Sequence, residues 1–367
     1  MIAPSPDRLG YRPALDGVRA IAILMVLLVH TGAFLIPGPD DHVLPGGALG
    51  VDLFFVLSGF LITSLLLERR AERHPIASFY LRRALRLLPA VVVLLVGTAV
   101  IALAEGEPAR SVANTFAAVL TYTTNWALLA GVSIERHLTH LWSLAIEEQF
   151  YAVWPLLLLG VLATARSRTQ LLWLTLGLAL ASALWRAALW ESGHGWEQLY
   201  LRTDVRADSL LIGAALAQLP WRRVAAVSTR WRTVAGGAAL VALLAAAETL
   251  KASSAVLYLG GYSVVAVLAA VLIAAVLPGS GALATTLGAA PAVAVGRLSY
   301  SLYLWHFPLF IVVGEHTGTW ATAPRVVTAW ALTFAVATAS YRLVERPALA
   351  LKGRVGRRAA PLAQATP

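Results

Sequence analysis

The 367-residue chain is 59% hydrophobic and 13% charged, a composition that excludes an ordinary soluble domain. Its formal net charge of +10 comes mostly from arginines in short segments between apolar runs, which indicates membrane topology rather than nucleic-acid binding. The lack of cysteine in the sequence excludes disulfides, thiolate metal sites and a cysteine nucleophile.

Apolar runs of about 20 residues recur along the chain, and each can cross the roughly 30 Å hydrocarbon core as a helix. The flanking arginines predict an all-α polytopic bundle of about ten spanning helices with both termini in the cytoplasm. The expected spans cover approximately residues 15–31, 49–67, 85–104, 141–163, 170–190, 204–219, 233–249, 257–277, 296–314 and 322–343. We expect a membrane domain over residues 1–347 and a basic, disordered cytoplasmic tail over 348–367.

Residues 112–130 are apolar but contain six Asn and Thr side chains, which is unusual for a spanning helix. If this segment crossed the bilayer, the next span would place Arg166 and Arg168 outside. That placement conflicts with the excess of basic residues on the cytoplasmic side. We therefore predict a re-entrant or interfacial segment, which membranes tolerate where it is buried in protein or faces water.

The first apolar run carries Arg19 near one end and His30 near the other. At about 100° per residue, these two side chains lie within about 20° of each other on the helix surface and therefore share one face. Ionisable groups at membrane depth are costly and normally face a cavity or a partner. A neutral imidazole there can accept a proton. The alternative is that Arg19 is a topology anchor and His30 a hydrogen-bonded packing residue.

Two polar groups lie in the next two spans. Asp52 is near the predicted outer end of its span, as is His30, so the carboxylate could orient the imidazole; alternatively, Asp52 caps its helix. Arg82, Arg83 and Arg86 lie at the predicted cytoplasmic start of the third span. Three guanidinium groups suit the binding of phosphates, although such a cluster also anchors a helix in the membrane.

The densest polar sequence lies at the predicted outer start of span 141–163. It contains His140, Trp142, Ser143, Glu147, Glu148, Gln149 and Tyr151. Because adjacent residues do not share a helix face, we expect Glu147 and Glu148 to have separate partners. This density favours a functional site, with a structural hydrogen-bond network as the alternative.

Two later segments also place polar residues within apolar sequence. Arg206 lies between Asp204 and Asp208, where arginine and aspartate could simply neutralise each other. The segment 297–306 ends in a second intramembrane histidine, His306. Its other polar and aromatic members are Arg297, Tyr300, Tyr303 and Trp305, and aromatic residues at an interface usually belong to the membrane belt.

Seven motifs follow one another in an order that is specific to one family. They are Arg19 with His30, GVDLFFVLSGFLIT (50–63), FYLRRALRLLP (79–89), HLWSLAIEEQFYAVWP (140–155), RADSLLIGAALA (206–217), GRLSYSLYLWHFPL (296–309) and VERP (344–347). Through them the chain resembles the acyltransferase-3 family of integral-membrane enzymes, which includes O-antigen, Nod-factor and macrolide O-acyltransferases. The resemblance covers approximately residues 11–347, and we expect no fused SGNH-type esterase domain.

The resemblance implies a membrane-embedded O-acyltransferase that moves an acyl group, most often acetyl, from cytoplasmic acyl-CoA to a hydroxyl. The acceptor would be a sugar, a cell-surface glycan or a glycosylated metabolite. No metal and no permanently bound cofactor is implied, since acyl-CoA is a substrate. The expected partners are the lipid bilayer, acyl-CoA and the glycan, with no nucleic acid and with a homo-oligomer left open. The expected location is the inner (cytoplasmic) membrane of a bacterium.

The family's signature pair corresponds to Arg19 and His30, and the resemblance implies that His30 acts as a general base or as a transient acyl carrier. Arg82, Arg83 and Arg86 would hold the phosphates of CoA, which agrees with their predicted cytoplasmic position.

The remaining role assignments are our own. We expect Asp52 to orient His30, and Glu147 or Glu148 to bind the acceptor or handle a second proton. Acceptor-binding or supporting roles are expected for Trp142, Ser143, Arg206, Asp208, Tyr303 and His306, of which Trp142, Ser143 and Tyr303 could donate to an oxyanion.

A different class of function is a proton-coupled transporter or channel with a relay of Arg19, His30 and Glu148. Such a relay has no need of the cytoplasmic arginine cluster.

Overall fold

The computed structural model describes residues 10–38, 43–69, 75–164 and 167–350, and within these ranges the chain forms helices and no strands. The all-α class is therefore confirmed. The expected tail, 348–367, lies outside the described residues after position 350.

Helices occupy all ten expected spans. They are α1 (Pro13–Leu35), α2 (Leu49–Arg69), α3 (Pro75–Ala104), α6 (Trp142–Thr164), α7 (Arg168–Glu191), α9 (Ala207–Gln218), α11 (Thr229–Thr249), η2 (Leu257–Gly261) with α12 (Tyr262–Val276), α14 (Ala290–His316) and α15 (Thr322–Ser340). In the described part of the chain, eight helices are long and apolar enough to cross a bilayer. The two expected spans outside these eight are α14, which is long enough but less apolar, and α9, whose 12 residues extend about 18 Å and alone cover only part of the hydrocarbon core.

Short helices connect the long ones. They are α4 (Ala109–Leu120), α5 (Thr124–Leu129), η1 (Arg136–Leu141), α8 (Trp196–Leu201), α10 (Trp221–Ala226) and α13 (Ala282–Leu287), whereas η3 (Tyr341–Glu345) is a π-helical turn that continues α15. Their lengths are insufficient for a membrane crossing, so they cover or cap the bundle of long helices.

The polar segment 112–130 folds into α4 and α5, which are joined by a turn. Glu105 precedes the segment, directly after α3, and Arg136 follows it. The guanidinium Nη2 of Arg136 lies 2.9 Å from Glu105 Oε2. Arg136 also pairs with Glu315 at the end of α14. Because the segment starts and ends at the same end of the bundle, it forms a helical hairpin, and its re-entrant or interfacial position in the membrane stays a prediction.

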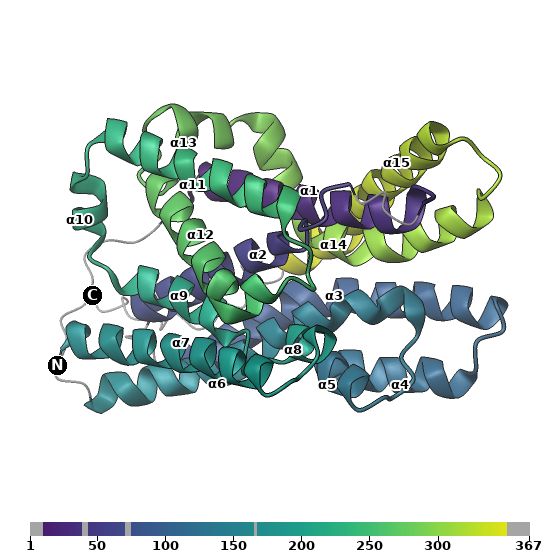
Figure 1. Cartoon of the computed structure of the whole chain (residues 1–367), viewed down its shortest axis with the longest axis horizontal. Helices are drawn as coiled ribbons and strands as arrows, with labels where there is room; N and C mark the ends of the chain where they lie inside the picture. Colours follow the sequence, from purple (N-terminus) through teal and green to yellow (C-terminus); the bar gives the residue numbers. More distant parts are fainter. Residues whose placement is uncertain (1–9, 39–42, 70–74, 165–166, 351–367) are drawn as a thin grey trace, which may run out of the picture.

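Helix α1 lies between α2 and α14 in the centre of the molecule, with α3, α6 and α7 on one side and α11 and α12 on the other (Figure 1). Small residues allow this close approach. A Cβ atom built on Gly296 of α14 would lie 1.9 Å from the carbonyl oxygen of Asp16 in α1, and one on Gly50 of α2 would lie 2.4 Å from that of Ala22. Such small-residue contacts are the usual means by which helices pack closely in membranes.

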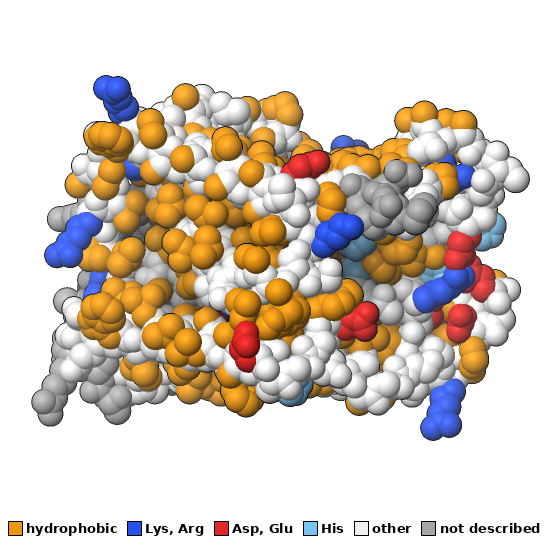
Figure 2. Space-filling view, viewed as in Figure 1, with side chains coloured by type: hydrophobic (Ala, Val, Ile, Leu, Met, Phe, Trp, Pro, Cys, Tyr) orange, Lys and Arg blue, Asp and Glu red, His pale blue; other side chains and the backbone are white. Residues whose placement is uncertain are grey.

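Apolar side chains are spread over much of the face seen in Figure 2, while charged side chains on it are few. Large exposed apolar residues occur on α3, α7, α11 and α12, for example Val100 (66%), Trp173 (68%) and Val241 (68%). A soluble protein does not present so large an apolar surface, so these helices face lipid. The chain is a multi-pass membrane protein.

Candidate active site

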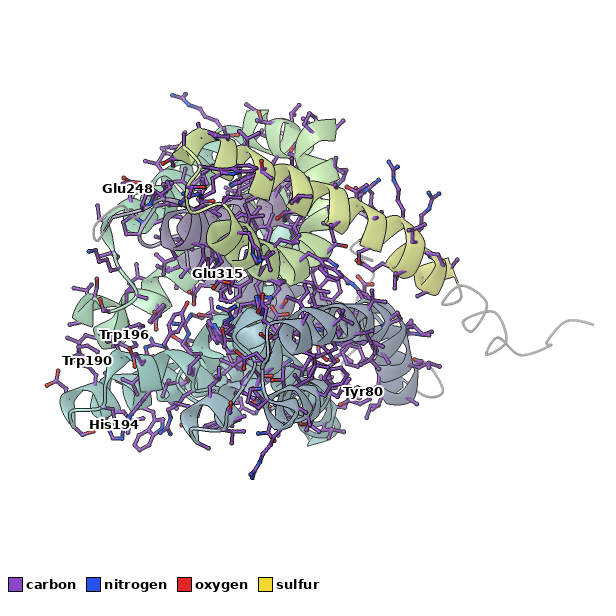
Figure 3. All side chains as sticks on the ribbon, turned by 90° about the vertical axis from the view of Figure 1, so that its right-hand side faces the viewer. Tyr80, Trp190, His194, Trp196, Glu248 and Glu315 are labelled. Carbon is purple, nitrogen blue, oxygen red and sulfur yellow. The ribbon has the colours of Figure 1, made fainter. Side chains whose placement is uncertain are left out.

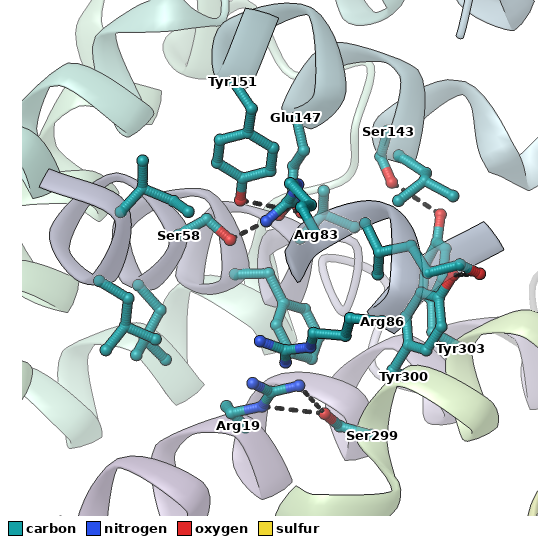
Figure 4. Close-up of a pocket in the computed structure, with 17 residues that line it drawn as sticks. Arg19, Ser58, Arg83, Arg86, Ser143, Glu147, Tyr151, Ser299, Tyr300 and Tyr303 are labelled. Carbon is teal, nitrogen blue, oxygen red and sulfur yellow. Dashed lines mark hydrogen bonds between the residues drawn. The ribbon is translucent and has the colours of Figure 1, made fainter. Parts of the chain in front are cut away.

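A cavity opens among α1, α2, α3, α6 and α14, nearer the start than the end of α1 and α3 (Figure 4). We call it the arginine cavity because Arg19, Arg83 and Arg86 line it. It encloses about 830 Å³ of space, including the part open to solvent. Of the three arginines that the sequence assigned to phosphate binding, Arg83 and Arg86 line this cavity and Arg82 does not.

Arg83 is already neutralised by a protein partner. Its Nε and Nη2 atoms donate to Glu148 Oε1 at 2.7 and 2.5 Å, and its guanidinium stacks 3.3 Å from the ring centre of Tyr151. Glu147 faces a different set of partners, Ser58 Oγ at 3.0 Å and Tyr151 Oη at 3.3 Å. The expectation of separate partners for the two glutamates is therefore confirmed.

Arg19 and Arg86 are the two arginines of this cavity without a carboxylate partner in the described chain. Arg19 donates from Nε and Nη2 to Ser299 Oγ at 3.1 and 2.9 Å, and Arg86 makes no hydrogen bond or ion pair with a described residue. The two guanidinium groups point toward one another and are close enough to repel (Figure 4). An anion between them would relieve this repulsion and could be bound bidentately.

A second cavity, of about 650 Å³ including the part open to solvent, lies further along α1 toward its C-terminal end. We call it the histidine cavity, since His30 and His140 line it together with Trp142, Tyr200 and Phe307. Among the described residues that line it, none is Asp, Glu, Lys or Arg.

The two cavities meet at Tyr303, which lines both of them, as does Val51. The hydroxyl of Tyr303 lies 2.7 Å from Ser143 Oγ and donates to the carbonyl oxygen of His140 at 2.5 Å. Tyr303 and Ser143 thus form a thin polar partition between the arginine cavity and the histidine cavity.

Hydrogen bonds determine which nitrogen of His30 carries a proton. His306 Nδ1 lies 2.8 Å from the carbonyl oxygen of Tyr303 and must donate to it, which leaves a lone pair on His306 Nε2. That nitrogen lies 3.2 Å from His30 Nδ1, which is also 2.9 Å from the carbonyl oxygen of Val26. His30 Nδ1 therefore carries the hydrogen, and His30 Nε2 has a free lone pair.

The expected contact between Asp52 and His30 is wrong. Asp52 is fully buried and accepts from Arg206 Nη2 at 2.9 and 3.0 Å and from Ser209 Oγ at 3.2 Å. A buried carboxylate requires a charged partner, and Arg206 supplies it. The residue that orients His30 is His306, from a helix 276 positions away in the sequence.

Arg206 does not neutralise its neighbours in the sequence. Asp208 pairs instead with Arg186 of α7, at 2.8 and 3.0 Å, and also accepts from Ser263. Sequence reasoning missed Arg186, although an arginine inside an apolar run is a recognisable sign of a buried partner. The two ion pairs therefore join α2, α7, α9 and α12 within the bundle.

Sequence reasoning also missed Ser58 and Ser299, because a single serine in an apolar helix is unremarkable. It noted His140 without assigning it a role. In the described residues, no group of three or more His, Cys, Asp or Glu side chains could hold a metal ion.

The chain matches the family model of the acyltransferase domain over residues 12–342. It is 32% identical to the peptidoglycan O-acetyltransferase OatA of Listeria monocytogenes, over 92% of this chain and 56% of that protein. It is 33% identical to the provisionally named peptidoglycan O-acetyltransferase YrhL of Bacillus subtilis, over 92% of this chain and 55% of that protein. The chain thus spans just over half the length of these relatives. No solved structure matches it. The match over most of its length places the chain in the acyltransferase-3 family.

Proposed function

We propose that the protein is a membrane O-acyltransferase that moves an acetyl group from acetyl-CoA to a hydroxyl of a sugar, a cell-surface glycan or a glycosylated metabolite. The observation that carries the proposal is the pair of cavities that meet at Tyr303: one holds two guanidinium groups without an ion pair to a described residue, and the other holds a histidine lone pair without a described donor. The names of the relatives favour peptidoglycan as the class of acceptor.

The arginine cavity is the proposed donor site. Arg19 and Arg86 would bind the phosphates of CoA, because they face the cavity and have no described carboxylate partner. Arg83, which pairs with Glu148, would shape the site rather than bind the phosphates. The extended pantetheine arm separates the phosphates of CoA from its thioester, and would direct the thioester past Tyr303 toward His30.

The chemistry needs one base. His30 Nε2 would take the proton of the acceptor hydroxyl as the oxygen attacks the carbonyl carbon of the thioester. The new C–O bond forms as the C–S bond breaks, and His30 returns the proton to the CoA thiolate. Ser143, at the partition, is the proposed hydrogen-bond donor to the oxygen of the intermediate, because the single proton of the Tyr303 hydroxyl is donated to the carbonyl oxygen of His140.

The glutamates contribute on the donor side in this proposal. Glu147 lines the arginine cavity and Glu148 pairs with Arg83, and neither lines the histidine cavity. An acceptor-binding role for either residue therefore finds no support. The transporter alternative loses support as well, because its relay would require Glu148 to act together with His30.

The proposed orientation places both termini in the cytoplasm and the protein in the cytoplasmic membrane. Arginines at the starts of α1 and α3 then face the cytoplasm, where acyl-CoA is made. The histidine cavity, nearer the opposite end of α1, would receive the acceptor from outside.

The decisive experiment measures release of free CoA and transfer of labelled acetyl by purified protein in nanodiscs, with acetyl-CoA and peptidoglycan fragments. We expect turnover by the unchanged protein and by His316→Gln, a control at the exposed end of α14. His30→Gln should reduce turnover to background with normal protein yield. Full activity of His30→Gln would refute the proposed role of His30.

A further inference from the structure

Glu147 contributes a carboxylate to the wall of the arginine cavity, and the proposed reaction gives it no contact with a substrate. Its oxygens accept from Ser58 Oγ at 3.0 Å and from Tyr151 Oη at 3.3 Å. Both of these partners line the same cavity, so the carboxylate that they hold lies at the cavity wall (Figure 4).

This carboxylate has unused capacity for hydrogen bonds. Two carboxylate oxygens offer about four acceptor sites, and among the described residues Ser58 and Tyr151 fill one on each oxygen. The neighbouring Glu148 pairs with Arg83, whereas Glu147 makes no ion pair with a described residue. A hydrogen-bond donor in the cavity can therefore bind Glu147 without displacing either of its partners.

The charge of Glu147 decides which part of the acyl donor can lie beside it. A carboxylate repels the phosphates of CoA, for which Arg19 and Arg86 are the proposed site. The pantetheine arm is uncharged and carries amide N–H groups, which donate to a carboxylate in strong, charge-assisted hydrogen bonds. Glu147 therefore suits the arm and not the phosphates.

The position of Glu147 on α6 selects one amide of the arm. Glu147 lies one helical turn after Ser143, about 6 Å along the helix axis, and both residues line the arginine cavity. Ser143 is at the partition, and Glu148 pairs with Arg83, so this turn leads from the partition toward the arginines. In acyl-CoA four bonds separate the thioester carbon from the nearest amide nitrogen, which is roughly 5 Å in an extended chain. A thioester at Ser143 thus places this amide beside Glu147.

We propose that Glu147 binds the acyl donor by accepting a hydrogen bond from the pantetheine amide N–H nearest the thioester. The contact holds the thioester at the partition, one helical turn away at Ser143. This inference rests on the proposed function and adds the residue that binds the uncharged arm of the donor.

The test compares acetyl-CoA with an analogue in which an ester oxygen replaces this amide N–H. The analogue keeps the thioester and the phosphates but cannot donate the hydrogen bond. For acetyl transfer to peptidoglycan fragments in nanodiscs, the unchanged protein should show a kcat/KM about 10- to 100-fold lower with the analogue, the loss expected for a hydrogen bond to a charged group. In Glu147→Ala the two donors should differ by less than about threefold, because the acceptor is missing. Hydrolysis of both thioesters without protein supplies the background.

The ratio between two donors on the same protein cancels any loss of folded protein in a variant. Glu147→Gln keeps an acceptor oxygen and should retain a preference for acetyl-CoA of at least about threefold. Glu148→Ala should slow the reaction of both donors by the same factor and keep the ratio, since Glu148 does not line the cavity. Glu248→Ala is the second control and should change neither rate, because Glu248 is exposed near the end of α11 (Figure 3).

The contact and the proposed function can fail separately. Equal ratios in the unchanged protein and in Glu147→Ala, or equal use of both donors by the unchanged protein, would overturn the contact, while transfer from acetyl-CoA would retain the function. Absence of transfer from both donors by the unchanged protein would refute the proposed function and the contact together.

Discussion

The imidazole of His30 is fixed by a second imidazole from a neighbouring helix. His30 Nδ1–H is shared between the carbonyl of Val26 and Nε2 of His306, and this leaves Nε2 of His30 as the base. In hydrolases with a catalytic triad a carboxylate orients the histidine and stabilises its charged form. Here the orienting group is neutral, so it fixes the tautomer without adding negative charge beside it.

Removing the acceptor atom of His306 should therefore lower the rate without disturbing substrate binding. We expect His306→Leu to reduce kcat about tenfold, the effect of a lost hydrogen bond, with both KM values within twofold. The reduction is limited because Val26 still accepts from His30. His306→Gln, whose side-chain oxygen can accept, should recover most of the rate. Equal losses in the two variants, measured by CoA release, would indicate a packing role instead.

Single substitutions can distinguish the arginines that line the arginine cavity from the neighbouring arginine that does not. Arg86→Ala and Arg19→Ala should raise the KM for acetyl-CoA roughly 10- to 100-fold, because each removes a charge-assisted contact to phosphate. Arg82→Ala, outside the cavity lining, should leave this KM within about threefold.

S-acetylpantetheine provides the internal control for this prediction, since it carries the thioester but no phosphate. Its KM should be the same for the unchanged protein and for Arg86→Ala. If Arg86→Ala weakened both donors equally, Arg86 would support the fold of the cavity and would not bind phosphate.

At the scale of helices, glycines determine how closely α2 and α9 approach. A Cβ atom on Gly59 would lie 1.9 Å from the carbonyl oxygen of Leu210, and one on Gly213 would lie 2.0 Å from that of Val56. Both contacts are with backbone atoms, which cannot rotate away. This reciprocal contact brings Asp52 of α2 within reach of Arg206 at the start of α9.

Two glycine substitutions should therefore have opposite effects on stability. Gly213→Ala forces α2 and α9 apart and should cost about 1–3 kcal/mol, the usual penalty of overpacking. Gly237→Ala in α11 meets no atom within 4 Å, so it should be neutral or stabilise the helix by up to about 1 kcal/mol. Thermal unfolding in detergent measures both, and similar melting temperatures for the two variants would contradict this account of α2 and α9.

The helices themselves follow from local sequence, whereas their contacts do not. Apolar runs and flanking arginines are local signals, and they located the ten expected helices, including the short α9, and set the polar segment 112–130 apart from them. Which buried charges meet depends on packing between distant segments: Asp52 with Arg206 and Asp208 with Arg186 could not be paired from spacing. For the same reason Arg19 and His30 were identified as sharing a face, while their partners Ser299 and His306 on α14 were not.

At the scale of the whole molecule, the two cavities lie at different positions along the axis of the bundle. The arginine cavity lies nearer the start of α1 and α3, and the histidine cavity lies nearer the end of α1, with Tyr303 between them. A donor and an acceptor can therefore approach from opposite sides and meet at one partition. This arrangement serves transfer across a membrane only if the starts of α1 and α3 face the cytoplasm.

The orientation can be tested directly because the chain has no native cysteine. Arg110→Cys and Ser133→Cys flank the re-entrant segment at exposed positions, and Ser228→Cys lies before α11, at the proposed cytoplasmic end. In intact cells a membrane-impermeant maleimide should label the first two, while Ser228→Cys should react only after permeabilisation. Labelling of Arg110→Cys and Ser133→Cys from opposite sides would mean that the segment crosses the bilayer. Labelling of Ser228→Cys alone in intact cells would reverse the bundle and place the arginine cavity on the side without acyl-CoA.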